Sequence, residues 1–189
     1  LEFRRVLFRS SRSRASGSRT REISTLLDVR TSPRWNFSIG PRLTRIEQNA
    51  QYVSTVTDPL MTATFGARYI FAALDQTEVS LVTRLNYTFT PDLSLELYLQ
   101  PLVSNGNYGT PKEFAAPSDY RFLTYGTDAG TLSKTGNRFT IDPDGSGPAA
   151  SFGVTDRSFT TRSVRGNAVL RWEYQPGSTM YLVWQQERL

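Results

Sequence analysis

Residues 77–100 carry the clearest pattern of apolar and polar positions in the chain, and its period is two. From residue 79 to 89 and from 93 to 99, odd positions are apolar except for one threonine, and even positions are mostly polar. Such alternation places one set of side chains on each face of a β-strand, whereas a helix would scatter both sets around its axis. The segment predicts two long strands that fold back on each other at Thr90-Pro91-Asp92.

Two further segments repeat this pattern. Residues 20–47 alternate on both sides of Thr31-Ser32-Pro33, and residues 164–187 alternate on both sides of Gln175-Pro176-Gly177. Apolar side chains across a hairpin must share a face, which predicts three pairs beside the turns: Val29 with Trp35, Phe89 with Leu93, and Tyr174 with Ser178. We therefore expect three hairpins with short, proline-containing turns.

The predicted strands are long, and their connections differ in length at the two ends. Strands of soluble proteins usually have about 5–6 residues, whereas a tilted membrane-spanning strand needs about 9–11. Residues 61–76 predict an outer connection, and the Gly- and Pro-rich residues 103–161 a long outer loop. Tight turns at one end and long loops at the other are typical of up-and-down barrels. The predicted fold is all-β, an antiparallel up-and-down meander of long hairpins that forms part of an outer-membrane-type β-barrel.

In such a barrel the polar face lines the lumen and aromatic residues gather at the membrane interface. The lumen-facing candidates could select a solute, or they could simply satisfy one another's charges, which is the plainer interpretation. These candidates are Arg84, Asn86, Glu96, Tyr98, Asn167, Arg171 and Glu173. The predicted membrane-interface aromatics are Trp35, Tyr87, Phe89, Trp172 and Tyr174.

Composition removes several classes of chemistry. The chain has no cysteine and no histidine, which excludes disulfides, thiolate or imidazole metal sites, and Ser-His-Asp or Cys-His catalysis. No apolar run is long enough for a transmembrane helix. The net charge of +5 is concentrated in an arginine-rich N-terminus, so no basic stripe indicates nucleic acid. We expect no cofactor, no metal, no nucleic-acid partner and no enzyme activity.

Two features of the outer loop have alternative interpretations. Asp142, Asp144 and Gly145 resemble half of a calcium loop but lack its distal glutamate, and a turn built from Asp, Pro and Gly is the simpler interpretation. Five aromatic residues of the loop could stack on sugar rings or could hold the loop against the rim of the barrel. They are Tyr108, Phe114, Tyr120, Phe122 and Tyr125.

The N-terminal residues lack the pattern of the hairpins. Residues 1–10, LEFRRVLFRS, resemble a translated sequencing-library adapter, and residues 11–19 are rich in Ser and Arg without a period. Residues 1–19 are therefore predicted to be an artefactual or disordered segment. The partial barrel domain is expected to span residues 20–189.

Three segments resemble a bacterial family: DQTEVSLVTRLNYTFTPDLSLELYLQP, DVRTSPRWNFSIGPR and SVRGNAVLRWEYQPGSTMYLVWQQ. They are similar to the C-terminal barrel, a domain of unknown function, of uncharacterised outer-membrane proteins with an N-terminal domain like carbohydrate-binding family nine. That domain is missing here, and Glu187-Arg188-Leu189 lacks the terminal aromatic residue usual for such barrels. We expect a fragment of some six strands whose partners are outer-membrane lipid, the remaining strands and N-terminal domain of the parent chain, and a glycan.

The sequence thus favours a non-catalytic outer-membrane barrel of structural or transport type, from a parent that binds or takes up carbohydrate at the surface of a Gram-negative cell. One alternative is a soluble β-sandwich that binds glycans through the aromatic loop. A second is a hydrolase that works through carboxylates such as Glu96 and Glu173. No further sequence feature supports the hydrolase.

Overall fold

The structure is a computed structural model and describes residues 2–15, 17–117 and 119–188 of the chain. It is all-β and antiparallel, and the one helix among the described residues is a single 3-10 turn, η1 (Thr62–Thr64). No helix in this part of the chain is long and apolar enough to cross a membrane. The fold prediction is confirmed as far as an all-β, up-and-down antiparallel arrangement.

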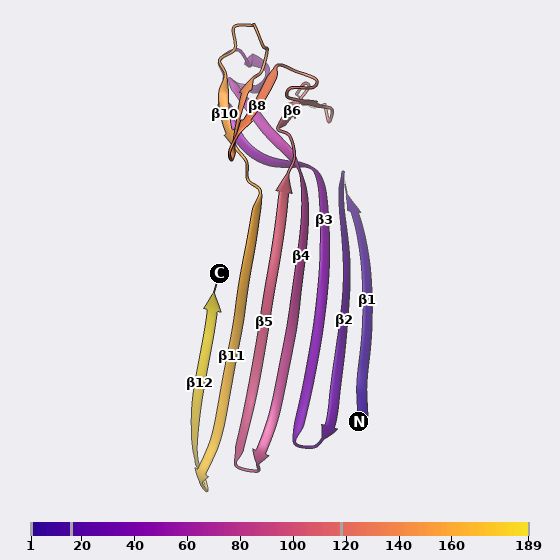
Figure 1. The fold of residues 1–189 in the computed structure, drawn as a ribbon, viewed down its shortest axis with the longest axis vertical. Coiled ribbons are helices and arrows are strands. Elements are labelled where there is room, and N and C mark those ends of the chain that lie inside the picture. Colours follow the sequence, from indigo (N-terminus) through magenta and orange to yellow (C-terminus); the bar gives the residue numbers. More distant parts are fainter. Residues whose placement is uncertain (1, 16, 118, 189) are drawn as a thin grey trace.

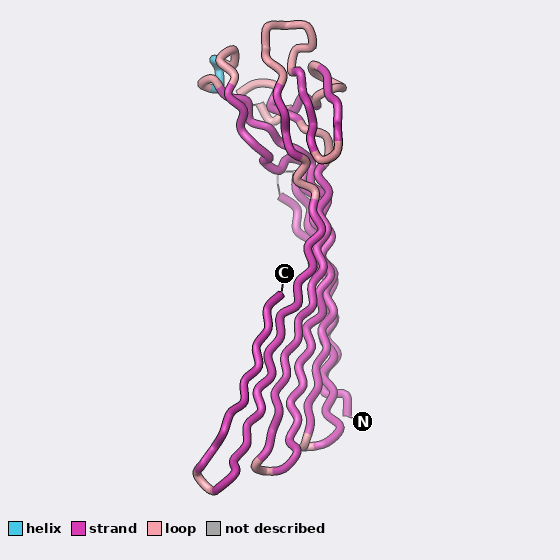
Figure 2. The backbone as a smooth tube through the Cα atoms, turned by 60° about the vertical axis from the view of Figure 1, so that its left-hand side comes forward, coloured by secondary structure: helices cyan, strands magenta, loops and turns pink. Residues whose placement is uncertain are grey.

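Seven long strands lie in chain order in one sheet, as Figure 1 shows, and each is antiparallel to the next. They are β1 (Glu2–Ala15), β2 (Ser18–Ser32), β3 (Trp35–Thr57), β4 (Ala67–Thr90), β5 (Leu93–Tyr108), β11 (Phe159–Gln175) and β12 (Ser178–Arg188). Two short strands extend the same sheet as a branch from β4. Among the described strands, β1 and β12 are the two edges of this sheet. Below its upper end the sheet is a single layer, whose strands overlap in the middle of Figure 2 and spread apart toward the tight turns.

The N-terminal segment differs from the expectation of disorder. Residues 2–15 form β1, which pairs with β2, and residues 18–19 belong to β2. This strand lacks a clear period-two pattern because Ser and Arg occupy both of its faces toward the C-terminal end. Its exposed Val6 and Phe8 nevertheless lie opposite Leu27 and Thr25, on the same face as the apolar residues of β2. The resemblance of residues 1–10 to an adapter stays a prediction.

The three tight turns contain two residues, not three, and each begins with proline: Pro33-Arg34, Pro91-Asp92 and Pro176-Gly177. Proline fixes φ near −65°, which rules out the primed turns whose twist matches antiparallel strands. Each hairpin instead has a β-bulge beside its turn, and a bulge increases local twist. Phe89 and Tyr174 are the extra residues of two of these bulges, so their predicted pairs with Leu93 and Ser178 are wrong. Leu93 pairs with Thr90, and Ser178 pairs with Gln175.

Away from the turns, the predicted registers of two hairpins are correct. Arg84 lies opposite Tyr98 in the second hairpin, and Trp172 lies opposite Met180 in the third. The register of the first hairpin was wrong by two positions, because Val29 pairs with Phe37 and not with Trp35. A shift of two residues keeps every side chain on its predicted face, so the patterning alone could not detect the error.

The upper part of the molecule, which we call the head, contains the outer connection predicted for residues 61–76 and takes the place of the long loop predicted for residues 103–161. There β4 begins at Ala67 and β5 runs to Tyr108. The remaining strands of the head are β6 (Lys112–Phe114), β7 (Phe122–Thr124), β8 (Thr131–Thr135), β9 (Arg138–Asp142) and β10 (Phe152–Thr155). Strands β8, β9 and β10 form a second sheet.

The main buried hydrophobic cluster of the described chain lies in the head. Val53 of β3 and Ile70 of β4 are buried together with Phe139 and Ile141 of β9. The second sheet therefore packs on the upper ends of β3 and β4, and the expected irregular loop is a folded unit. Its strands were missed because they are only three to five residues long, too short for a period to be recognised.

Candidate functional site

The polar face of the long sheet carries all seven predicted lumen-facing residues. Arg84 of β4, Tyr98 of β5 and Asn167 of β11 lie in one row across three strands. Asn86 and Glu96 form the adjacent pair nearer the turns. Arg171 and Glu173 lie nearer still to the turns on β11, so the prediction that these side chains share a face agrees with the register.

Several polar side chains on this face contact one another. The Arg84 guanidinium lies 5.5 Å from the centre of the Tyr98 ring, and the Tyr98 hydroxyl donates to Gln100 Oε1 at 2.6 Å. Arg171 Nη2 donates to Glu173 Oε2 at 3.3 Å. The diagonal pair Arg84–Glu96 is not an ion pair among those of the described residues. Two pairs that the prediction omitted also lie here: Glu22–Arg42 at 3.6 Å and Arg165–Glu187 at 2.8 Å.

Glu96 and Glu173 are not placed for paired-carboxylate chemistry. Glu96 lies opposite Val169, and Glu173 is four positions further along β11, about 13 Å away at 3.3 Å per residue. Glycosidases hold their two carboxyl groups at most about 9.5 Å apart. Glu173 also accepts the backbone N–H of Gly177 at 3.1 Å, which gives it a structural role in the turn.

The opposite face is apolar from β2 to β12. One row across the sheet runs from Val29 through Phe37, Leu85, Leu97 and Ala168 to Trp184. Each long strand contacts the strands beside it in the ladder, and below the head no second layer of the described chain covers this face. Several of its large side chains are about half exposed, including Val79 at 52% and Leu182 at 64%. Monomeric soluble proteins rarely expose apolar surface on this scale.

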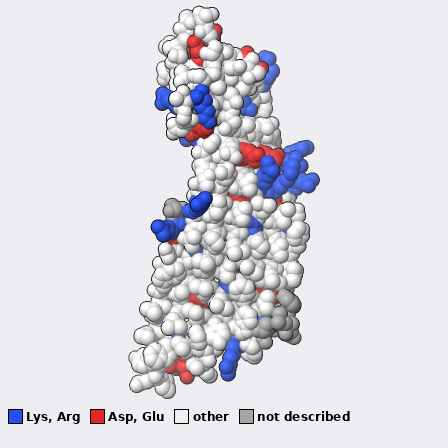
Figure 3. All heavy atoms as spheres, in the orientation of Figure 1, with Lys and Arg blue, Asp and Glu red and all other residues white. Residues whose placement is uncertain are grey.

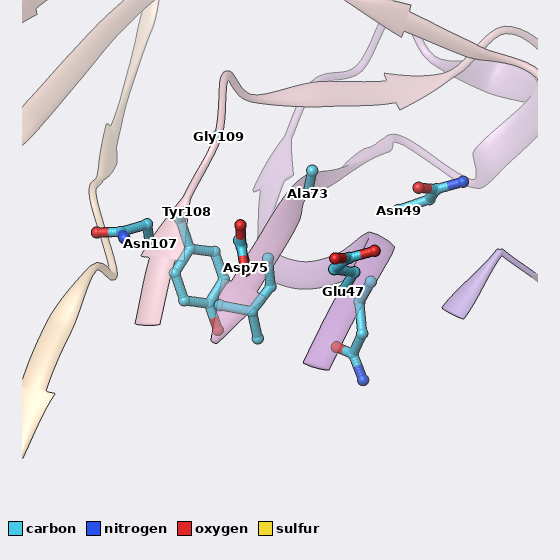
Figure 4. A pocket seen from close by; sticks show the side chains of 9 residues that line it. Glu47, Asn49, Ala73, Asp75, Asn107, Tyr108 and Gly109 are labelled. Carbon is cyan, nitrogen blue, oxygen red and sulfur yellow. The ribbon is translucent and has the colours of Figure 1, made fainter. Parts of the chain in front are cut away.

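The apolar face ends abruptly at a charged row. Ile23, Leu43, Val79 and Val103 form its last apolar row, and the next row in the same direction is Arg21, Arg45, Thr77 and Asn105. Arg45 pairs with Asp75 at 3.0 Å and with Glu47 at 3.5 Å. Figure 4 shows Glu47 and Asp75 at a hollow of about 340 Å³ that Asn107 and Tyr108 also line.

The five predicted interface aromatics lie at the other end of the apolar face, beside the tight turns. Trp35 pairs with Tyr87 across β3 and β4. The Tyr87 and Phe89 rings meet edge to face with centroids 4.6 Å apart, and Trp172 and Tyr174 do so at 6.1 Å. The apolar face is thus bounded by aromatic residues at one end and by charged residues at the other.

The five loop aromatics separate into two groups in the head. Tyr108 and Tyr125 belong to the hydrophobic core. Phe114, Tyr120 and Phe122 form an aromatic cluster with Tyr52 and Phe71, in which the Phe114 and Phe122 rings stack at 4.6 Å. Lys112 Nζ lies 4.6 Å from the Phe122 ring centre, and burial lowers the pKa of this lysine.

A buried ion cluster in the head was not predicted from the sequence. Arg68 Nε donates to Asp58 Oδ2 at 2.7 Å, and Arg68 Nη1 donates to Glu113 Oε1 at 2.6 Å. Burial would raise the pKa of Asp58, but the hydrogen bonds from Arg68 and from the Leu60 N–H outweigh it and lower the pKa. Burial together with the nearby Glu113 carboxylate raises the pKa of Tyr125. These residues are far apart in sequence, so no local motif marks them.

The possible calcium residues build a turn. Asp142 Oδ1 accepts the Gly145 N–H at 2.9 Å, and Asp144 Oδ2 accepts the Ala149 N–H at 2.9 Å. In the part of the chain that the structure describes, no three Asp, Glu, His or Cys side chains lie close enough together to hold a metal ion.

Comparisons with protein-family models, with curated proteins and with solved structures find no match to this chain.

Proposed function

We propose that this chain is the membrane-embedded part of an outer-membrane β-barrel, with its apolar face toward lipid and its polar face toward an aqueous lumen. The barrel serves a structural or transport role and performs no catalysis. The head, at the end with the long connections, lies outside the bilayer on the cell surface.

The observation that carries the proposal is the height of the apolar band. From Val79 to Phe89, β4 rises about 33 Å at 3.3 Å per residue. A strand tilted by about 40°, as in outer-membrane barrels, crosses about 25 Å over that length, which is the usual height of the lipid-facing band. The charged row at Arg45 and the aromatic residues at Tyr87 and Phe89 then fall at the two membrane interfaces.

The two sheet edges require partners. Unpaired backbone groups of β1 and β12 would be costly in hydrocarbon, and the smallest barrels have about eight strands. We propose that further strands of the parent chain close the barrel. The family resemblance supports a parent that binds or takes up carbohydrate, and the solute that the lumen passes is left open.

The aromatic cluster of the head favours a second function, a soluble glycan-binding module. Tyr52 is 49% exposed and Tyr120 is 63% exposed, so these rings offer surface for stacking on a sugar. This alternative requires another layer of protein to cover the apolar face of the long sheet.

The test is to refold the full chain in detergent and in plain buffer and to record circular dichroism of both samples. We expect β-structure in detergent and aggregation in buffer. A monomeric β-fold in buffer that is equally stable without detergent would refute the membrane assignment and favour the glycan-binding module.

A further inference from the structure

Four arginines form a compact group on the apolar side of the sheet, where β1 and β2 meet the charged row. Arg12 lies directly opposite Arg21, and Arg14 lies directly opposite Arg19. We call these four residues the arginine square. Figure 3 shows the corresponding gathering of basic side chains at the upper ends of β1 and β2, next to an acidic group.

This arrangement is electrostatically unfavourable without a bound anion. Side chains directly opposite each other in an antiparallel pair have Cβ atoms about 4.5–5.5 Å apart, and like charges at that distance destabilise the pair. The square contains two such like-charge pairs in successive rows of one face, and Arg21 lies opposite a third arginine, Arg45, on β3.

The nearby carboxylates offset the charge of the square only in part. Glu47 lies opposite Arg19, but Glu47 and Asp75 both pair with Arg45. Among the ion pairs of the described residues, none includes a member of the square. Arg21 Nε is buried with no hydrogen-bond acceptor among the described residues, whereas Arg12 and Arg14 are exposed, so an external oxygen can reach their guanidinium groups.

Apolar side chains adjoin the square on the same face. Ile23, two positions from Arg21, is 47% exposed, and Leu43 beside it on β3 is 43% exposed. A ligand that contacts both groups has an anionic head and an apolar tail. Guanidinium groups bind phosphate through two parallel hydrogen bonds, which makes phosphate the anion that four arginines suit best.

We propose that the arginine square binds the phosphorylated headgroup of a membrane lipid whose acyl chains lie along Ile23 and Leu43. This inference rests on the proposed membrane function, because it places the square at the upper interface of the bilayer. Arg12, Arg14, Arg19 and Arg21 hold the phosphate oxygens, and the apolar rows below them hold the hydrocarbon.

The test is native mass spectrometry of the full chain in detergent, titrated with lipid A (a glycolipid with two phosphates) and with dephosphorylated lipid A. The test variant is Arg19→Gln/Arg21→Gln. The matched control, Arg34→Gln/Arg157→Gln, removes the same charge at a tight turn and in the head. We expect the test variant to bind lipid A about tenfold or more weakly, the control to bind as the unaltered chain does, and dephosphorylated lipid A to bind weakly to all three.

Equal lipid A affinity in the two double variants would overturn the site. Full displacement of lipid A by equimolar inorganic phosphate would also overturn it, because the square would then recognise free phosphate and not a lipid. Circular dichroism of the same samples separates the two proposals. If the chain folds only in detergent but binds lipid A equally well without the arginines, the barrel proposal stands and the lipid-site proposal is refuted. If the chain folds in plain buffer and its lipid A binding depends on the arginines, the barrel proposal is refuted and the lipid-site proposal stands.

Discussion

At the scale of single residues, Arg68 connects two segments that are far apart in the sequence. Its guanidinium links Asp58, which precedes η1, to Glu113 of β6, and all three side chains are about 10% exposed. A buried ion pair adds little net stability when it is complete. Removal of one partner, however, leaves the other charge buried and uncompensated. Two carboxylates depend here on one cation.

Replacement of Arg68 by Met is therefore expected to destabilise the head by about 3–5 kcal/mol. The matched control is Arg121→Met, which removes an exposed pair with Asp119 at 3.4 Å and is expected to change stability by less than about 1 kcal/mol. Hydrogen exchange of the β8–β10 amides measures both variants. Similar protection in the two variants would show that the buried cluster does not hold the head together.

Asp156 makes the stability of the head depend on pH. Burial would raise its pKa, but the hydrogen bonds from Lys134 Nζ at 2.6 Å and from Ser158 outweigh burial and lower the pKa to about 2. The pKa of an unfolded aspartate is about 3.9. The stabilisation is therefore fully present above about pH 4 and is lost as pH falls toward 2.

We expect the head to lose about 1–2 kcal/mol of stability between pH 5 and pH 2 through Asp156, a value reduced because Lys134 is partly exposed. Asp156→Asn keeps the oxygen that accepts from Ser158 and should flatten this part of the pH profile. Proteolysis of the head at several pH values, with an acid-stable protease, gives the profile. An unchanged profile in the variant would assign the acid sensitivity to other carboxylates.

At the scale of elements, the tight turns set the geometry of each hairpin. Pro176 and Gly177 occupy the two central positions of their turn, and Gly177 has φ +80°, as a type II turn requires. The turn ends also bond to neighbouring hairpins: Arg34 O accepts the Thr88 N–H at 2.7 Å, and Asp92 O accepts the Glu173 N–H at 2.8 Å.

Gly177→Val is expected to destabilise the β11–β12 hairpin by about 1–2 kcal/mol, because a branched side chain is strained at positive φ. Gly177→Asn is the matched substitution and should cost less than half as much, since asparagine tolerates this conformation. Urea titration of the chain refolded in detergent measures both. Equal losses would mean that the backbone conformation of Gly177 is not the limiting feature.

At the scale of the whole molecule, the proposed orientation makes the cost of a charge depend on its depth. Leu97 lies near the middle of the apolar band and Val79 in its last row. Leu97→Arg should cost about 2–4 kcal/mol and Val79→Arg about 0–1 kcal/mol in a bilayer. Urea unfolding from phosphatidylcholine vesicles compares them, and equal penalties at the two positions would contradict the assigned membrane boundaries.

The sequence predicts features that depend on neighbouring residues better than features that depend on residues far apart in the chain. The period-two pattern around Leu85 and Leu97 was enough for the hairpins, their faces and two registers, because strand alternation is a local property. It could not give the two-residue register shift at Val29, which preserves the faces. Nor could it give the contacts of Arg68 or the arginine square, which depend on pairing between residues that share no motif.

In the proposed membrane arrangement, one face of the long sheet contacts lipid while the other contacts water. Because the sequence contains no cysteine, single-cysteine variants along β5 from position 93 to 103 can each carry one spin label in the chain refolded in vesicles. Collision with oxygen reports lipid contact, and collision with a water-soluble nickel complex reports water contact. We expect oxygen access at Leu95, Leu97 and Leu99 and nickel access at Glu96 and Tyr98. Odd positions shielded from both reagents would contradict this arrangement and would indicate a protein core on that face.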